Sequence, residues 1–274
     1  MTAAATDSVC SQTYSNIEII IVDDGSTEPD SVGLSQHTDP RVTLIRHPVN
    51  QGAAAARNAG ISQARGEFVA FLDSDDSWPS DKIEQQLKYM NSGAGRAIDL
   101  CCTGFYYSRI GRGRGKRVRL EINGTTSTNL LDGCFLSPGS TLMARRAFLH
   151  SLGPQNESLG RLEDWEWLLR ASRITNIALL PKILAYVESN ERANFKSVAL
   201  AGQTLRRLQG RAVFQQHGAR GFLRFSASVD LECSVCALKC GRTQWLIFYI
   251  FRALISHPMR VLHFFGGAVR RQLC

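Results

Sequence analysis

Two apolar runs that each end in aspartates constrain the fold of this chain most strongly. Residues 17–22 read IEIIIV and lead into Asp23 and Asp24, and residues 68–72 read FVAFL and lead into Asp73. Continuous apolar runs of this length are typical of strands that are buried on both faces of a parallel sheet. Because such sheets bind ligands beyond the carboxyl ends of their strands, the sequence predicts an open α/β sheet whose ligand site contains these aspartates.

The segments around these two runs extend the same pattern. Strands alternate with helices over the first ninety or so residues, which predicts right-handed crossovers. We expect a first domain over residues 1–190 and a helical, basic tail over residues 191–274. Strands are predicted at 42–46, 100–108, 140–144, 177–180 and 185–187, helices at 2–12, 52–64, 80–91 and from 145, and a glycine-rich hairpin tip at 111–119.

The charge of the chain points to an acidic partner. Lys and Arg number 32 against 24 Asp and Glu, which gives a net charge of +8. Nucleotides, anionic lipid headgroups and nucleic acids all fit such a surface. The basic segment 111–119 contains no aromatic residue on which a base could stack, so we expect no nucleic-acid partner.

The C-terminal tail carries a short apolar segment. Residues 245–255 read WLIFYIFRALI, eleven residues against the roughly twenty that a membrane span needs. Arg252 interrupts it, and Arg260, Arg270 and Arg271 follow. This pattern predicts a helix lying in the plane of an anionic membrane face, and the alternative is a helix packed on the rest of the protein. No signal peptide is evident, so we expect a cytoplasmic protein, peripheral on the inner face of the plasma membrane.

The segment Asp73-Ser74-Asp75-Asp76 places several carboxylates in one tight loop. Carboxylate oxygens are the ligands that Mg²⁺ and Mn²⁺ prefer, and phosphate oxygens can complete the coordination. The alternative is a purely structural loop that caps the helix predicted at 80–91. We therefore predict a divalent metal at this loop, with Asp75 as its ligand.

Three further segments carry candidate chemistry. Asp24 precedes Gly25, which permits a sharp turn that leaves the carboxylate facing a cleft. Residues 50–60 read NQGAAAARNAG, a helix start of small residues with Arg57 available to pair with a phosphate. Glu163 and Asp164 begin a helical pattern, where an acidic residue is either a partner of the helix dipole or a general base.

Four motifs in this order resemble the family-2 glycosyltransferases of the GT-A fold. They are VDDGS, N-x-G-x-x-x-A-R-N-x-G, LDSDD and LEDWEWLLR, and the resemblance covers roughly residues 10–189. It implies a mixed, Rossmann-like sheet with helices on both faces, followed here by the helical tail. It also implies a hexosyltransferase that moves a sugar from a nucleotide-diphosphate sugar to an acceptor hydroxyl, with inversion and with Mn²⁺ or Mg²⁺.

The resemblance also implies roles for individual residues. Asp24 contacts the nucleobase, Asp73 lies near the ribose, Asp75 binds the metal that bridges the diphosphate, and Arg57 sits near the nucleotide. Asp164 is the general base that takes the proton of the acceptor hydroxyl. A glycan or a lipid-linked glycan of cell-envelope polysaccharide synthesis is the expected acceptor, because the tail is basic and apolar.

Two other functions are compatible with the same residues. A phosphatase or phosphotransferase uses a D-x-D pair at a strand end with the first aspartate as nucleophile, and it needs a downstream lysine, for which Lys182 is the nearest candidate. A catalytically inactive domain that serves as a binding scaffold is the second alternative. Relatives of this family begin with an apolar strand ahead of the helix in which Met1 lies, so we expect the first strand to be missing and the chain to be poorly stable.

Overall fold

The computed structural model describes residues 2–27, 39–92, 98–109, 112–118, 126–189 and 194–272. The chain forms two compact units. The first contains residues 1–121, 135–157 and 170–191, and the second contains residues 122–134, 158–169 and 192–274. The boundary expected near residue 190 stays a prediction.

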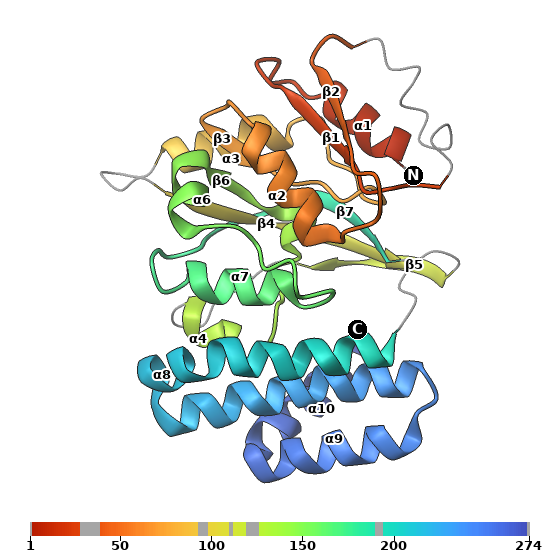
Figure 1. Ribbon diagram of the computed structural model, residues 1–274, viewed down its shortest axis with the longest axis vertical. Helices are drawn as coiled ribbons and strands as arrows, with labels where there is room; N and C mark the ends of the chain where they lie inside the picture. The colour runs from red at the N-terminus through yellow and green to blue at the C-terminus, as the bar shows by residue number, and fades with distance from the viewer. Residues whose placement is uncertain are drawn as a thin grey trace. The chain divides into compact units, whose positions relative to one another are not determined.

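A mixed, five-stranded sheet forms the centre of the first unit (Figure 1). Strand β4 is central to it, because β6 and β5 pair with β4 antiparallel and β7 pairs with it parallel. Strand β3 completes the sheet by pairing antiparallel with β6. The bounds of these strands are Phe68–Ala70 for β3, Leu100–Arg109 for β4, Arg112–Val118 for β5, Met143–Arg145 for β6 and Ala178–Ser189 for β7.

Two further strands of this unit form a separate parallel pair. Strand β1 (Ile19–Asp23) pairs with β2 (Val42–Arg46), starting from Ile19 opposite Val42. Within the described residues, β1 has β2 as its only neighbour, and β3 has β6 as its only neighbour. Each of these two apolar strands therefore has one edge without a strand partner in the part of the chain that the structure describes.

A cavity of about 1200 Å³ separates these two strand edges. Consecutive residues of both strands line it, among them Ile19 and Ile21 of β1 and Phe68 and Val69 of β3. A six-residue strand in a packed sheet occupies a block of roughly 20 by 4.8 by 10 Å, or about 960 Å³, which is less than the volume of this cavity. This cavity supports the expectation that the sheet accepts one more strand, which stays a prediction.

The helices of the first unit pack on these strands. Helix α2 lies against β1 through small side chains, and Ala54 and Ala55 are buried there. Helix α3 contacts β4 and β7, and the buried Gln86 amide donates hydrogen bonds to the carbonyls of Cys101 and Thr141. The helices are α1 (Thr2–Cys10), α2 (Ala53–Gln63), α3 (Lys82–Asn91), α5 (Pro138–Thr141) and α6 (Arg146–Leu152).

The second unit is helical. Its longest helix, α8, folds back on itself at Gly218, whose φ of 66° is a left-handed conformation that glycine adopts without a steric penalty. The two arms of α8 lie side by side, since Arg206 on one arm pairs with the buried Asp230 on the other. The helices are α4 (Thr126–Leu130), α8 (Phe195–Lys239), α9 (Thr243–Ser256), α10 (Pro258–Gln272) and the first seven residues of α7 (Glu163–Ala171).

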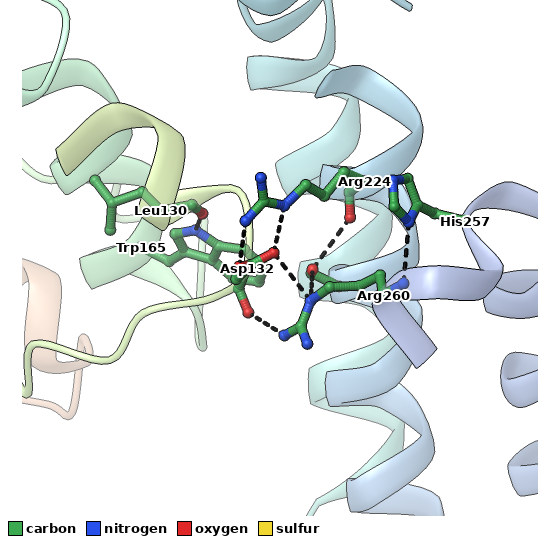
Figure 2. A network of polar contacts seen from close by, with 7 residues as sticks. Leu130, Asp132, Trp165, Arg224, His257 and Arg260 are labelled. Atoms are coloured by element: carbon green, nitrogen blue, oxygen red, sulfur yellow. Dashed lines mark hydrogen bonds and ion pairs between the residues drawn. The ribbon is translucent and has the colours of Figure 1, made fainter. Parts of the chain in front are cut away.

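A network of charged groups around Asp132 holds α8 and α10 together (Figure 2). The Asp132 carboxylate accepts a hydrogen bond of 2.7 Å from Arg224 Nε on α8 and lies 3.1 Å from Arg260 Nε on α10. Arg260 Nη2 also donates to the Asp132 carbonyl, at 2.6 Å. Because the Arg260 side chain is only 13% exposed, these contacts fix the position of α10 on α8.

Among the described helices, none is long and apolar enough to cross a membrane.

Candidate active site

The acidic loop predicted after the strand at 68–72 directly follows β3. Asp76 anchors it, since its buried carboxylate accepts a hydrogen bond from the Ser140 hydroxyl and one of 2.9 Å from the backbone N–H of Glu188. Burial raises the pKa of Asp76 to about 6, although these two hydrogen bonds oppose the shift and the neighbouring Asp73 and Asp75 add to it. Asp76 therefore holds the loop in place, and Asp73 and Asp75 are left to contact a ligand.

Asp75 lies in a surrounding that favours a cation. Burial raises the pKa of its carboxyl group, and the negative charges of Asp73 and Glu188 raise it further. Within the part of the chain that the structure describes, no ion pair or hydrogen bond from another residue engages this carboxylate, and no group of three or more metal-ligating side chains occurs. A divalent cation would relieve the repulsion, so the hard oxygen donors of Asp75 and Asp73 fit Mn²⁺ or Mg²⁺, with phosphate and water oxygens completing the coordination.

Asp73 is positioned by contacts on three sides. Its Oδ1 lies 2.9 Å from Arg57 Nη2 on α2, and its backbone N–H donates to Ser140 Oγ at 3.1 Å. Gly139 closes the third side, because a Cβ at that position would lie only 2.0 Å from Asp73 Oδ2. The carboxylate nevertheless stays 44% exposed, so it remains accessible to a ligand.

The segment that supplies Ser140 and Gly139 is helical, which corrects the strand predicted at 140–144. Helix α5 turns the chain at Ser137, whose φ of 46° is unusual for a residue other than glycine, and only Met143–Arg145 is a strand. Its small, fully buried residues bring the backbone next to the acidic loop, and Trp78 Nε1 donates to the Ser140 carbonyl at 2.7 Å.

Two neighbouring residues of α2 tie the acidic loop to a second loop. Arg57 pairs with Asp73, while the Asn58 amide donates to the Gln155 carbonyl at 2.9 Å and to Glu157 at 2.8 Å. The Gln155 backbone N–H donates in return to Asn58 Oδ1 at 2.8 Å. The motif at 50–60 thus has a structural role besides any contact with phosphate, because it joins two loops that are distant in the sequence.

Asp24 lies at the end of β1 and holds the start of α2. Its two oxygens accept hydrogen bonds from the backbone N–H groups of Gln51, at 3.0 Å, and Gly52, at 2.7 Å, and Oδ1 also lies 2.7 Å from His47 Nδ1. Although burial acts in the opposite direction, these hydrogen bonds hold the pKa of Asp24 below its ordinary value. Asp24 is therefore an ionised group at the edge of the cavity, and its contact with a nucleobase stays a prediction.

The predicted nucleotide-binding residues share one cavity. Asp24, Arg57 and Asp73 all line the 1200 Å³ cavity, and the part that they line is here called its polar end; residues of β1 and β3 line the cavity as well. Sequence reasoning missed His47, Gln155 and Glu188, which lie beside predicted site residues. These three residues lie outside the recognisable motifs, so no local pattern marks them. Only the fold of the chain brings them close to the predicted site residues.

Asp164 belongs to the second unit, at the start of α7. Its Oδ2 accepts a contact of 3.3 Å from the Cys134 thiol, and the side chain is half-buried. The next residue anchors the helix, because the fully buried Trp165 donates from Nε1 to the Leu130 carbonyl at 2.8 Å and packs edge-on against Phe225. Leu162, just before the helix, has a φ of 61°, a strained conformation of the kind found at functional sites.

Comparisons with known proteins identify the same family as the motifs. The family model described as Glycosyl transferase family 2 matches residues 1–152, more than half of the chain. The chain is 44% identical over 89 residues to the UDP-Glc:alpha-D-GlcNAc-diphosphoundecaprenol beta-1,3-glucosyltransferase WfaP of Escherichia coli, covering 32% of this chain and 36% of the relative. It is 35% identical over 173 residues to an uncharacterised glycosyltransferase of Rickettsia felis, covering 62% of this chain and 28% of the relative. The matched segment thus spans about a third of the length of these relatives.

Solved structures share the fold. The crystal structure of Staphylococcus aureus TarS 1-349 in complex with UDP superposes with a TM-score of 0.57 over 97% of this chain and 88% of that chain, at 18% identity. The mannosyltransferase PcManGT from Pyrobaculum calidifontis, in complex with GDP-Man and Mn²⁺, gives a TM-score of 0.57 over 93% and 82%, at 16% identity. These likenesses confirm the predicted GT-A fold, a mixed α/β sheet with helices and a C-terminal helical part.

Proposed function

The chain belongs to glycosyl transferase family 2, and from this premise we propose that it moves a sugar from a nucleotide-diphosphate sugar to an acceptor hydroxyl with inversion of the anomeric configuration. The observation that carries this proposal is the acidic loop at the end of β3, where Asp73 pairs with Arg57 and Asp75 lies near the negative charges of Asp73 and Glu188. A leaving diphosphate accumulates negative charge, and an arginine next to a cation-binding carboxylate stabilises that charge.

The donor would bind at the polar end of the cavity. Asp24, Arg57 and Asp73 line this end, and the positive Arg57 suits a diphosphate while the carboxylates suit the hydroxyl and N–H groups of ribose and base. A divalent ion, Mn²⁺ or Mg²⁺, would be held by Asp75 with Asp73. When bound, it supplies positive charge next to the diphosphate oxygens. The same positive charge would offset the negative charges of Asp73 and Glu188 near Asp75.

Asp164 would act as the general base. The carboxylate takes the proton of the acceptor hydroxyl while that oxygen attacks the anomeric carbon from the side opposite the leaving diphosphate. One displacement of this kind forms the new glycosidic bond, breaks the bond to the diphosphate and inverts the anomeric carbon. The buried Trp165 and the pair between Glu166 and Gln209 fix the helix that carries Asp164, and such rigidity suits a base that must hold one position.

The acceptor would be a lipid-linked glycan of envelope polysaccharide synthesis. Two E. coli relatives are named as glucosyltransferases acting on a diphosphoundecaprenol-linked sugar, and a Bacillus subtilis relative is named for teichuronic acid biosynthesis. The matched segments cover about a third of each of these relatives, so the acceptor comes to this chain as part of the proposal. Work on such an acceptor would place the protein at the inner face of the plasma membrane.

The two alternative functions have less support. A phosphotransferase would need a lysine next to Asp73, but the Lys182 ammonium bonds to the Gln85 side chain. A scaffold without activity would need no cation at the acidic loop. The binding of nucleotide decides between transfer and scaffold.

The test is a titration of UDP, GDP and dTDP, each with and without Mn²⁺, that records the melting temperature. We expect one nucleotide to raise it in the presence of Mn²⁺. Asp75→Asn should abolish the rise, because it removes a negative charge from the metal site. Asp81→Asn is the matched control, since Asp81 lies outside the cavity-lining residues and near Gln85.

The outcomes separate the alternatives. A Mn²⁺-dependent shift that Asp81→Asn keeps and Asp75→Asn loses supports the transferase site and identifies the donor nucleotide. If a cooperatively folded protein shows no shift with any nucleotide, the proposal is wrong and the scaffold remains. Equal shifts in both variants would place the nucleotide away from Asp75.

A further inference from the structure

Helices α9 and α10 each expose a row of large apolar side chains, and the two rows together are here called the apolar stripe. Its side chains recur every three or four residues, so they lie on one side of each helix. Each is 40% to 69% exposed, which is unusual for so many large apolar residues in adjacent helices. The members are Ile247, Phe248, Phe251, Leu254 and Ile255 on α9, and Met259, Leu262 and Phe265 on α10.

The opposite side of the same helices is buried in the second unit. Tyr249, Ala253 and Val261 are at most 3% exposed, and Ala253 and Val261 form a core cluster with Ala227 and Leu231 of α8. The network around Asp132 holds α10 in this orientation (Figure 2). The apolar stripe is therefore a surface presented by fixed helices, and the internal packing of the unit does not use it.

The charge of this region is of one sign. Residues 233–274 contain no Asp or Glu, whereas they contain Lys239, Arg242, Arg252, Arg260, Arg270 and Arg271. Arg260 pairs with Asp132, and Arg252 Nε lies 3.7 Å from the buried Asp230, so both arginines have an acidic partner on a neighbouring element. Arg252 nevertheless stays 40% exposed next to the stripe, where it lies over the rings of Phe248 and Tyr249. A long side chain of this kind can place its apolar part along the stripe and its charge at the level of lipid headgroups.

We propose that the apolar stripe docks on an anionic lipid bilayer, with α9 and α10 lying in the plane of the membrane surface. The length of the helices excludes a span, because the 14 residues of α9 extend about 21 Å and the hydrocarbon core is about 30 Å thick. Apolar side chains on one face with cationic groups around them are the pattern of helices that insert shallowly between anionic headgroups. A second copy of this chain fits the surface less well, since a symmetric contact would bring two basic regions together.

The docking deepens the proposed function, because it would bring the protein to the surface that holds a lipid-linked acceptor. Its measurement needs neither nucleotide nor acceptor. Failure of vesicle binding and failure of nucleotide binding are therefore separate results, and each proposal can be wrong without the other.

The experiment is co-sedimentation of the full chain with vesicles of phosphatidylcholine that contain about one third phosphatidylglycerol, compared with pure phosphatidylcholine. We expect binding to the anionic vesicles that weakens as salt is added, because salt screens the lysines and arginines. The variant Ile247→Glu with Phe251→Glu places two charges in the stripe, and we expect its partition coefficient to fall at least about tenfold.

The matched control is Leu200→Glu with Phe214→Glu. These two residues lie on α8 and are 66% and 52% exposed, against 64% and 62% for Ile247 and Phe251. The control should bind anionic vesicles like the unaltered protein, and sedimentation velocity without lipid should show both variants folded and unassociated. Equal vesicle binding by both variants would overturn the proposal, and so would self-association of the unaltered chain that only the stripe variant loses, since the occupant would then be a second copy.

Discussion

The contact between Gly139 and Asp73 predicts a loss of activity from a single methyl group. In Gly139→Ala, the new Cβ would lie 2.0 Å from Asp73 Oδ2, whereas ordinary contacts begin at 3.4 Å. The carboxylate must therefore move by about 1.4 Å, because the methyl group is attached to the backbone of α5 and Asp73 is the more flexible partner. That movement breaks the 2.9 Å contact with Arg57 and displaces a donor-binding group, and a misplacement of about 1 Å costs roughly 100-fold in turnover.

The assay follows release of nucleoside diphosphate from the donor that the nucleotide titration selects, together with the melting temperature. We expect turnover to fall roughly 100-fold while the free energy of unfolding changes by about 1 kcal/mol or less, because the φ of Gly139 is one that alanine tolerates. Gly266→Ala is the control, since no atom lies within 4 Å of its Cβ position and activity should not change. Full turnover in a folded Gly139→Ala protein would refute the role given to the position of Asp73.

Three further predictions concern charge and packing in the first unit. Burial lowers the pKa of Lys82 to about 7, and the unfolded chain keeps this lysine protonated to about pH 10, so the free energy of unfolding should rise by roughly 2 kcal/mol from pH 7 to pH 9. The Lys82→Met variant should lack that rise when its free energy of unfolding is measured with urea at both pH values. If the variant shows the same rise as the unaltered protein, the rise does not come from a buried Lys82 ammonium. Glu188→Gln removes a negative charge near Asp75, so we expect the affinity for Mn²⁺, measured by calorimetry, to fall about fivefold. An unchanged affinity would show that Glu188 does not belong to the metal site. An apolar segment of about six residues fused ahead of Met1 should enter the gap between β1 and β3 and raise the melting temperature. The same segment with aspartate at every second position is the control and should not raise it. Equal melting temperatures of the two fusions would show that the gap does not take a strand.

The sequence predicted the strands at the start of the first unit closely, because their signals are local. Strand β2 has the predicted bounds, and β1 and β3 begin within two residues of the prediction. Apolar runs that end in aspartates report burial on both faces of a strand and the start of a loop, and both depend on neighbouring residues alone. The motifs around Asp24, Arg57 and Asp73 could therefore be placed at one cavity without the structure.

Other elements depend on distant residues and were predicted less well. The basic segment expected as a hairpin tip is strand β5 over Arg112–Val118, because pairing with β4 outweighs the weak strand preference of its glycines. The two apolar pieces at 177–180 and 185–187 form one strand, β7, in which the irregular register opposite Gly104 accommodates Pro181. The contacts of Ser140 and Glu188 with Asp76 join segments 64 and 112 residues apart, which no local pattern reports.

The most direct test of sugar transfer is the turnover of Asp164→Asn with a short polyprenyl-diphosphate sugar as acceptor. Asparagine keeps the shape of the side chain but cannot accept the proton of the acceptor hydroxyl. If Asp164 is the general base, turnover should fall by about 10² to 10⁴-fold while the Kd for the donor nucleotide stays unchanged. Turnover at the rate of the unaltered enzyme, or a loss of donor binding in place of turnover, would contradict the proposed mechanism.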